Sequence, residues 1–335
     1  YGVLTFDKDS GRPYSTNNLV GNSKVTGWNG QLVPPKVCHL VAVGHYHGFT
    51  VIREAFIKDP PFPYSLASAG RIEGEHLEVF GLADGKYSAL KSGENLVIEE
   101  KDKQQSEVLS NSPGASDGDS IVFRSDVKVT GHVKAVGNIE TAADTQIQGM
   151  LLPQSAEQSL PDVKISELDP KKKDGVYEWD NSFTSVVGRA RHTGNLTVGD
   201  LELADGLLFV EGDLTVTGTI KGKGALVATG KITVTGSMDT QSDNAALVAG
   251  GDITIRGQGP ASSRFQGLVY SEGSVDISKT TIIGAAVSKA ATGVTKLEEV
   301  KAIQSPDLTS YKIVIHPTLE KAKKSAITTL EKYEA

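Results

Sequence analysis

Four stretches of the chain share one pattern of apolar, polar and glycine positions. In each, apolar residues lead to a glycine, and a short run that alternates apolar and polar residues follows it. The stretches are LFVEGDLTV from Leu208, LVATGKITV from Leu226, LVAGGDITI from Leu247 and VYSEGSVDI from Val269. Alternation with a period of two is typical of a half-buried β-strand. A repeat of roughly 20 residues matches one coil of a solenoid.

The frame of the repeat predicts how the coils stack. Strands that carry one motif in one frame run in the same direction, so we predict parallel coils in register, ~4.8 Å apart. A threonine column would line the outer face, from Thr215 through Thr233 to Thr254. Inside the stack, Ile232 would lie beside Ile253. The first glycine of the motif recurs at Gly212, Gly230, Gly251 and Gly273.

The corner of each coil carries two further predictions. The residue after the glycine reads Asp213, Lys231, Asp252 and Ser274 in successive repeats. Stacking in register would alternate opposite charges up this column and so avoid like-charge repulsion. We expect the glycines themselves to permit a positive φ at corners where a Cβ would clash.

Weaker copies of the pattern extend the predicted solenoid over residues 65–295. Two long loops interrupt it, a polar one at 99–119 and one with three prolines at 152–191. We expect the aromatic side chains of the second loop to anchor it to the solenoid wall in preference to forming a binding surface. These aromatic residues are Tyr177, Trp179 and Phe183. The weaker copies are GRIEGEHLEVFG at 70–81, SIVFRSDVKVTG at 120–131 and GNLTVGDLEL at 194–203.

The two ends of the chain differ from the solenoid. Residues 1–64 form an N-terminal β region, in which Val37–Ile57 predicts an antiparallel hairpin turning around Gly44–Gly48. Residues 296–335 are assigned to a C-terminal helical segment that follows Pro317 and would cap the open end of the solenoid or dock on its side. Its apolar stripe is Leu319, Ala322, Ala326, Leu330 and Tyr333. The predicted fold class is all-β: a parallel β-solenoid with an N-terminal hairpin region and a C-terminal α-helix.

Composition narrows the function without identifying it. Of 335 residues, 36 are glycine and only 6% are aromatic, which suits short strands and tight turns. The net charge of -7 disfavours nucleic-acid binding unless a basic patch exists, and we interpret the triplet Lys171–Lys173 as a solvated loop. No apolar run could span a membrane, so membrane contact would need a segment outside this sequence. The start at Tyr1 suggests a processed or truncated chain.

A small cluster of histidines is one candidate for chemistry. His45 and His47 would share one face of a strand, since side chains two positions apart align. Two imidazoles could contribute to a zinc or copper site, with further ligands from across the hairpin or from nearby Cys38 and His39. We favour two half-exposed histidines in a glycine-rich turn and expect no metal site. Cys38 is the single cysteine, so no internal disulfide can form.

Carboxylates are the other candidate. Asp200 and Glu202 would face the same side of a strand, with Asp205 close behind. Glycoside hydrolysis needs two carboxylates ~5–9 Å apart, and sugar-binding grooves also tend to offer aromatic platforms. Outward positions here are mostly Thr and Lys, with Tyr270 an exception, so we interpret the acids as surface residues. The chain has no phosphate-binding GK[ST] loop, no GxGxxG that opens a helix and no GxSxG, so we expect no catalytic residue and no cofactor.

The order of these elements resembles two kinds of bacterial protein. A strand ending in a glycine turn, a return strand, and Phe62–Leu66 (FPYSL) followed by Gly70 and the solenoid resemble the PilX-like minor-pilin-related proteins of type IV pilus systems. The likeness covers about residues 37–295 and rests on short motifs. The coils are also similar to bactofilins, polymers built from parallel β-helices. The resemblance implies a right-handed coil and a bacterial cell-surface setting, and it provides no catalytic residue. The long loops and the C-terminal helix depart from the pattern.

We therefore expect a non-enzymatic, extracellular structural or adhesive protein associated with a pilus or surface filament. Its solenoid would be a rigid scaffold, and its partners would be other proteins or further copies of itself, with a surface glycan as a further ligand. Two alternatives stay open: a carbohydrate-active enzyme, and a DNA receptor at a pilus tip, which the acidic balance disfavours. A cleft with paired acids and an aromatic floor would favour the enzyme. An exposed apolar end coil would favour assembly.

Overall fold

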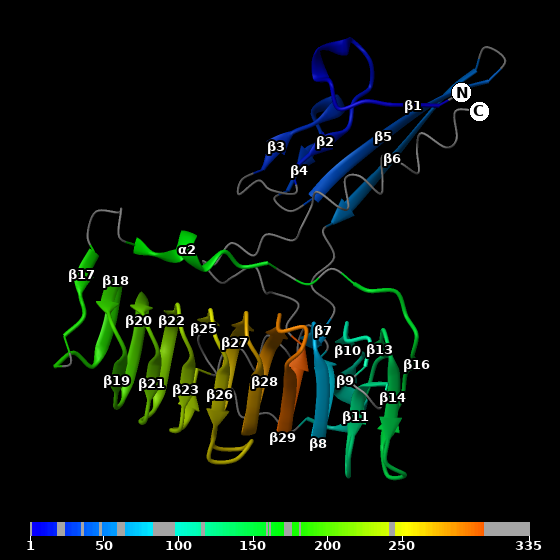
Figure 1. The fold of residues 1–335 in the computed structure, drawn as a ribbon. Coiled ribbons are helices and arrows are strands. Elements are labelled where there is room, and N and C mark those ends of the chain that lie inside the picture. Colours follow the sequence, from blue (N-terminus) through cyan, green and yellow to red (C-terminus); the bar gives the residue numbers. More distant parts are fainter. Residues whose placement is uncertain are drawn as a thin grey trace. The chain divides into compact units, whose positions relative to one another are not determined.

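The computed structural model divides into two compact units, with the boundary between Pro61 and Phe62 (Figure 1). In the described part of the chain, no helix is long and apolar enough to cross a membrane. The described residues are 2–18, 24–34, 37–46, 49–58, 64–82, 98–114, 118–158, 160, 162–170, 176–180, 182–240 and 245–304.

The N-terminal unit is built on an antiparallel hairpin. Strands β5 (Val37–Tyr46) and β6 (Phe49–Lys58) pair along their full length, as the sequence predicts. The other long edge of β5 pairs with β1 (Gly2–Leu4) and β2 (Thr16–Asn17), so β5 lies in the middle of the sheet. Short elements complete the unit: η1 (Lys8–Ser10), β3 (Val25–Thr26), η2 (Trp28–Gly30) and β4 (Leu32–Val33).

The second unit is a parallel β-solenoid made from two parts of the chain. The first part contains β7 (Tyr64–Ser68), β8 (Arg71–Leu82), η3 (Glu100–Asp102), β9 (Lys103–Gln104), β10 (Glu107–Ser110), β11 (Asp119–Phe123), β12 (Lys128–Val129), β13 (Val133–Ala135), β14 (Asn138–Thr141), β15 (Gln146–Ile147) and β16 (Leu151–Leu152). β9 pairs antiparallel with β8, whereas every other described strand pair in this unit is parallel. Strand β10 and the start of β11 therefore fall within residues 99–119, which the sequence assigned to a loop.

The second part of the solenoid begins after a crossover. The crossover contains α2 (Ile165–Leu168), and the second part contains β17 (Val176–Glu178), β18 (Ser185–Thr193), β19 (Leu196–Val198), β20 (Leu201–Glu211), β21 (Leu214–Val216), β22 (Ile220–Ala228), β23 (Ile232–Val234), β24 (Met238–Asp239), β25 (Ala245–Ala249), β26 (Ile253–Arg256), β27 (Arg264–Ser271), β28 (Val275–Ser288) and β29 (Val294–Gln304). Residues 296–304, assigned above to a helical segment, are thus a strand. The predicted helix after Pro317 lies outside the described residues.

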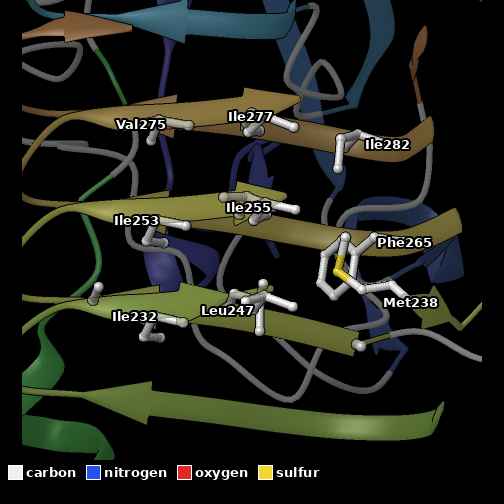
Figure 2. Close-up of a cluster of buried hydrophobic side chains, with 14 of the residues drawn as sticks. Ile232, Met238, Leu247, Ile253, Ile255, Phe265, Val275, Ile277 and Ile282 are labelled. Atoms are coloured by element: carbon white, nitrogen blue, oxygen red, sulfur yellow. The ribbon is translucent and has the colours of Figure 1, made fainter. Parts of the chain in front are cut away.

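The predicted stacking is confirmed in its register. Ile232 pairs with Ile253, and Ile253 pairs with Val275, on parallel strands. Figure 2 shows these three side chains one above another in the core, and all are fully buried. The threonine column follows the same register on the outer side, through Thr215, Thr233 and Thr254.

The charged corner column is also as predicted, and it does more than separate like charges. The Lys231 ammonium lies 3.1 Å from a carboxylate oxygen of Asp252. Each carboxylate also accepts a backbone N–H from the next coil, Asp213 from Lys231 at 2.7 Å and Asp252 from Ser274 at 3.0 Å. The N–H of Ser274, and after it the Lys231 ammonium, hold the pKa of Asp252 below its ordinary value.

The corner glycines confirm the expected clash of a Cβ but, at most corners, not the expected positive φ. Of the four, only Gly212 has a positive φ. A Cβ on Gly230 would instead overlap the Asp213 carboxylate and press on the backbone of Gly212. At the other three corners the glycine therefore serves close packing between coils, and not a positive φ.

The coils do not stack in the order of the sequence. On one side of β28, the stretch Asp276–Gly284 pairs with β29, and the stretch Ala286–Ser288 pairs with β7. One coil is thus assembled from 294–304 and 64–68, two segments from opposite ends of the unit. β29 in turn pairs with β8, and β7 with β10. The chain therefore enters and leaves the described stack within this middle coil, which we call the seam coil.

A crossover returns the chain from one end of the stack to the other. At its first end, the backbone of Gln158 makes two hydrogen bonds with the Asn111 side chain, at 2.6 and 3.0 Å. At its other end, Asp169 forms an ion pair with Arg191 at 3.3 Å. We call residues 158–169 the strap. It crosses roughly seven strand spacings of ~4.8 Å along the solenoid wall, and it includes one helical turn, α2.

The strap covers an apolar column on the outside of the solenoid. Register places in one line the outward residues Phe209, Val227, Val248, Tyr270, Val287, Ala67 and Leu109. Val163 of the strap packs on this column, and its N–H donates to the Tyr270 hydroxyl at 3.2 Å. Ile165 and Leu168 pack against the same cluster. The strands before each corner are therefore buried on both faces, and most of the expected 152–191 loop is a structural element.

We expect the corner glycine to matter more than the outer threonine. A Gly230→Val substitution forces the Asp213 carboxylate away from the Lys231 N–H, and should lower the free energy of unfolding by about 2–4 kcal/mol. The matched Thr233→Val change replaces an outward, partly exposed hydroxyl with a methyl group, so it should cost less than about 1 kcal/mol. Denaturant unfolding of both variants measures the difference, and equal costs would contradict the packing role of Gly230.

The strap should contribute to stability through its buried side. Val163 is the strap residue that is buried against the apolar column. Val163→Asp therefore places a carboxylate in this column and should lower the free energy of unfolding by about 2–4 kcal/mol. Lys164 points away and is half exposed, so Lys164→Ala should change it by less than about 0.5 kcal/mol. The same unfolding measurement applies, and a harmless Val163→Asp would show that the strap is not held on the wall.

Candidate functional site

At one end of the solenoid, the last coil has no further strand beyond it among the residues that the structure describes. It consists of β14, β15 and β16, which pair on one side with β11, β12 and β13 respectively. In Figure 1 these strands lie at the opposite end of the stack from β17 and β18. The far edges of β14 to β16 form the end of the stack, so their backbone N–H and C=O groups can bind a further strand. We call residues 138–152 the end coil.

The core of the solenoid continues into the end coil, where no part of the chain that the structure describes buries it completely. Ile139 follows Ile72 and Ile121 in one inward column, and Ile147 follows Val129 in another. Ile121 and Val129 are buried, whereas Ile139 and Ile147 are half-buried. Leu151 is 45% exposed and the neighbouring Met150 is 56% exposed. Every residue from 138 to 152 is at least partly exposed to solvent. The apolar core is therefore open to solvent at this end.

The end coil also lacks the charges that commonly protect strand edges. Glu140 and Asp144 are its only ionisable residues, and it has neither lysine nor arginine. Asp144 is engaged, since its carboxylate accepts the Asp126 N–H at 3.0 Å. Natural sheets block exposed edges with charged side chains, lysine above all, to prevent unwanted pairing. The end coil thus has the composition of an interface.

The opposite end is capped by an aromatic side chain. Strand β17 adds to the outer edge of β18, and Trp179 directly follows β17. Its side chain is 5% exposed and joins the main core, with Phe183 against it edge-on at 5.6 Å between ring centroids. Leu196 in this terminal coil is buried and belongs to the same core cluster as Trp179. The aromatic residues expected to anchor a loop to the wall therefore close the end of the core.

The acidic candidates meet in a shallow groove that has another explanation. Asp200, Glu202 and Asp239 line a surface groove of about 600 Å³. Register sets Glu202 beside Lys221, and Lys221 beside Asp239, so the charges alternate along the stack. Asp200 accepts the backbone N–H of Thr219 at 2.7 Å, an interaction that joins two coils.

The groove lacks the second feature of a sugar-binding site. Its lining consists of the residues above with Thr184, Leu201, Thr219 and Gly222, and none of them is aromatic. Asp205 lies outside it, 3.8 Å from Lys223. The structure thus brings Asp200 and Glu202 into one groove, but the groove lacks the aromatic floor that would favour a carbohydrate-active enzyme.

The two described histidine candidates, His39 and His45, each have a hydrogen-bond partner of their own. His39 is buried in the N-terminal sheet, where its Nε2 lies 2.8 Å from Glu54 and its ring stacks on Phe56. His45 Nδ1 lies 3.1 Å from the hydroxyl of Thr50. Among the described residues, no group of three or more potential ligands could hold a metal ion. Both His47 and the triplet Lys171–Lys173 lie outside them.

The single thiol is equally placed in the interior. Cys38 is 6% exposed on β5, and burial raises its pKa above the ordinary value. A buried thiol with a raised pKa is a poor nucleophile.

In comparisons with known proteins, no family model, curated protein or solved structure matches the chain.

If Asp200 serves to join coils, its acceptor oxygen should matter and its charge should not. Asp200→Ala removes the acceptor for the Thr219 N–H and should lower the free energy of unfolding by about 1 kcal/mol. Asp200→Asn keeps an oxygen at that position, as Asn195 does for the N–H of Asp213 at 2.8 Å, and should cost much less. Thermal and denaturant unfolding distinguish the two, and an equal loss would contradict the structural role.

Proposed function

We propose that this chain is a non-enzymatic structural protein whose solenoid is a rigid scaffold that assembles with other protein molecules through its uncapped end. The observation that carries the proposal is the end coil. It combines an open apolar core, unprotected strand edges and an absence of basic residues. Exposed apolar surface of this kind marks interaction sites in proteins.

The rigidity of the scaffold follows from how the coils are joined. Neighbouring coils share parallel backbone ladders, fully buried side-chain columns and the carboxylate contacts at the corners. The strap adds a second connection, because it contacts successive coils from the one with Asn111 to the one with Arg191. Interiors packed this closely transmit strain and resist compression. A stack of this kind suits the transmission of force or the fixing of a distance.

The chemistry of the end coil points to β-strand pairing as the mode of assembly. Its strands offer backbone donors and acceptors along their edges, and its inward residues offer apolar surface. A partner that adds strands to this end would satisfy both, as in β-augmentation. The expected cell-surface setting belongs to the same proposal and rests on the resemblance to pilus and bactofilin proteins. Fractionation of the producing cells tests that part separately.

Self-association is the measurable consequence. We expect the full chain to show a mass that rises with protein concentration in sedimentation velocity, with assemblies of uniform width in electron microscopy. Ile147→Lys places a charge at the open core and should reduce the association at an unchanged circular dichroism spectrum. A single copy per particle up to the solubility limit would argue against the proposed function, since the open end would then have no partner of its own kind.

A further inference from the structure

The seam coil is the one place in the described stack where the spiral of the chain is interrupted. On one edge of β28, Gln304 pairs with Gly284. Two positions further along the same edge, Leu66 pairs with Ala286. The end of β29 and the start of β7 therefore lie in line within one coil, but no peptide bond joins them.

The interruption lets the stack divide without any strand leaving its coil. Between any other two coils the chain itself crosses from one to the next, so a peptide corner holds them together. A division at the seam coil instead passes between β29 and β8 and between β28 and β7. We infer that the solenoid opens reversibly at the seam coil into two rigid halves, 64–152 and 176–304, which the segment with the strap keeps tethered. The opening is independent of the end coil and goes beyond the proposed function.

A polar pair replaces part of the apolar core at the seam. The inward column through Val275 continues to Thr295, which is buried and pairs with Ile72 across the seam. The Thr295 hydroxyl donates to the hydroxyl of Ser68, in the other half, at 3.0 Å. Hydroxyls regain hydrogen bonds with water when they are exposed, so opening here costs less than it would between two apolar side chains.

A second inward column lacks a side chain at the same level. It runs through Ile277 to Leu297, which meets Gly74 across the seam. The space beside Gly74 is filled from its own half, because a Cβ there would lie 3.2 Å from Cδ1 of Phe123. This packing stays intact when the halves part, so it does not resist the opening.

The strap contacts both halves and crosses the seam. Leu160 belongs to an apolar cluster with Tyr64 and Leu109 of one half. Val163 packs in a separate cluster, and its N–H donates to the hydroxyl of Tyr270 in the other half. The outer apolar side chains on this wall are thus divided into two clusters at the seam. The strap links these clusters and would hold the open halves within reach of each other.

The closed state is still the favoured one. β29 pairs with β8 from Val294 to Ile303, and Phe80 packs with Ile303 on another wall. Lys301 lies 3.4 Å from Glu78 across the seam. The open state is therefore a minor population, of the kind that native-state hydrogen exchange detects. A scaffold built in this way is stiff under small loads and yields at one place under large ones.

Hydrogen exchange, resolved amide by amide in the full chain, tests the opening. When two rigid halves part, all amides that bond across the seam are exposed in one event, so they should share one opening free energy. The N–H groups of Ala69 and Arg71 bond to carbonyls across the seam, whereas that of Ile232 bonds between interior coils. We expect the seam amides to exchange about tenfold or more faster than the interior ones.

A disulfide across the seam provides the matched comparison. Ser68→Cys with Thr295→Cys replaces two hydroxyls that lie 3.0 Å apart, from which a small shift brings two sulfurs to bonding distance. The control, Thr219→Cys with Ser237→Cys, replaces another hydroxyl pair 3.0 Å apart, between interior coils. Both carry Cys38→Ala, so that only the introduced pair can bond. Oxidation of the seam pair should slow seam exchange to the interior rate and reduction should restore it, whereas the oxidised control should leave seam exchange unchanged.

The strap gives an independent variant. Val163→Asp weakens the grip of the strap on one half, so it should accelerate exchange at the seam amides more than at the interior ones. Lys164→Ala should leave the ratio of the two rates unchanged, because this side chain is half exposed. If the seam cysteines do not oxidise, this ratio decides.

Three results would overturn the inference. Seam amides that exchange as slowly as the N–H of Ile232 would show that the seam is no weaker than an interior junction. A steady gradient, fastest at Gln304 and slowest at Val294, would show fraying of single strand ends in place of the parting of two halves. A seam disulfide that forms without slowing the exchange would exclude the opening. None of these results bears on the end coil, so the proposed function is tested separately.

Discussion

The whole solenoid depends on backbone hydrogen bonds between coils. A short strand in one coil has no partner within that coil, so its N–H and C=O groups are satisfied only by the coils above and below. This requirement forces the parallel register that stacks Ile232 on Ile253. It also determines the side-chain choices, because every position becomes a column of near neighbours. Apolar columns form the core, alternating charges stabilise the corners, and glycines allow the backbones to approach.

The same requirement makes the two ends of the stack the natural place for function. An interior coil has two neighbours, while a terminal coil has one, so each end must be capped or used. Here the molecule does both. Among the described residues, β17 and Trp179 cover part of one end, and the other end has core positions that are only half-buried and few charged residues. The groove with Asp200 and Glu202 carries much less information, because alternation of charge along the stack already explains it.

The repeated glycine frame was enough to predict the parallel coils and the core columns, and the two apolar runs of Val37–Ile57 around Gly44–Gly48 predicted the N-terminal hairpin. The outer apolar column was missed, although the sequence shows its signal. The runs around Phe209, Val227, Val248 and Tyr270 are continuously apolar, which is typical of strands covered on both faces. The order of the coils was not predictable, because equivalent repeats carry no local mark of which neighbour they choose. The open end coil could be anticipated only from the repeat that ends before Pro153.

The seam coil has a consequence for how the protein is made. Its two halves, 294–304 and 64–68, are separated by most of the unit, and Thr295 bonds to Ser68 across 227 positions. During synthesis the first coils can stack as they emerge, but β8 waits without its other neighbour until β29 has been translated. Closing a contact over so long a stretch is slow, since its entropic cost precedes its reward. The nascent chain therefore exposes the unpaired edge of β8 for most of its translation. The yield of folded protein should depend on chaperones that shield such strand edges.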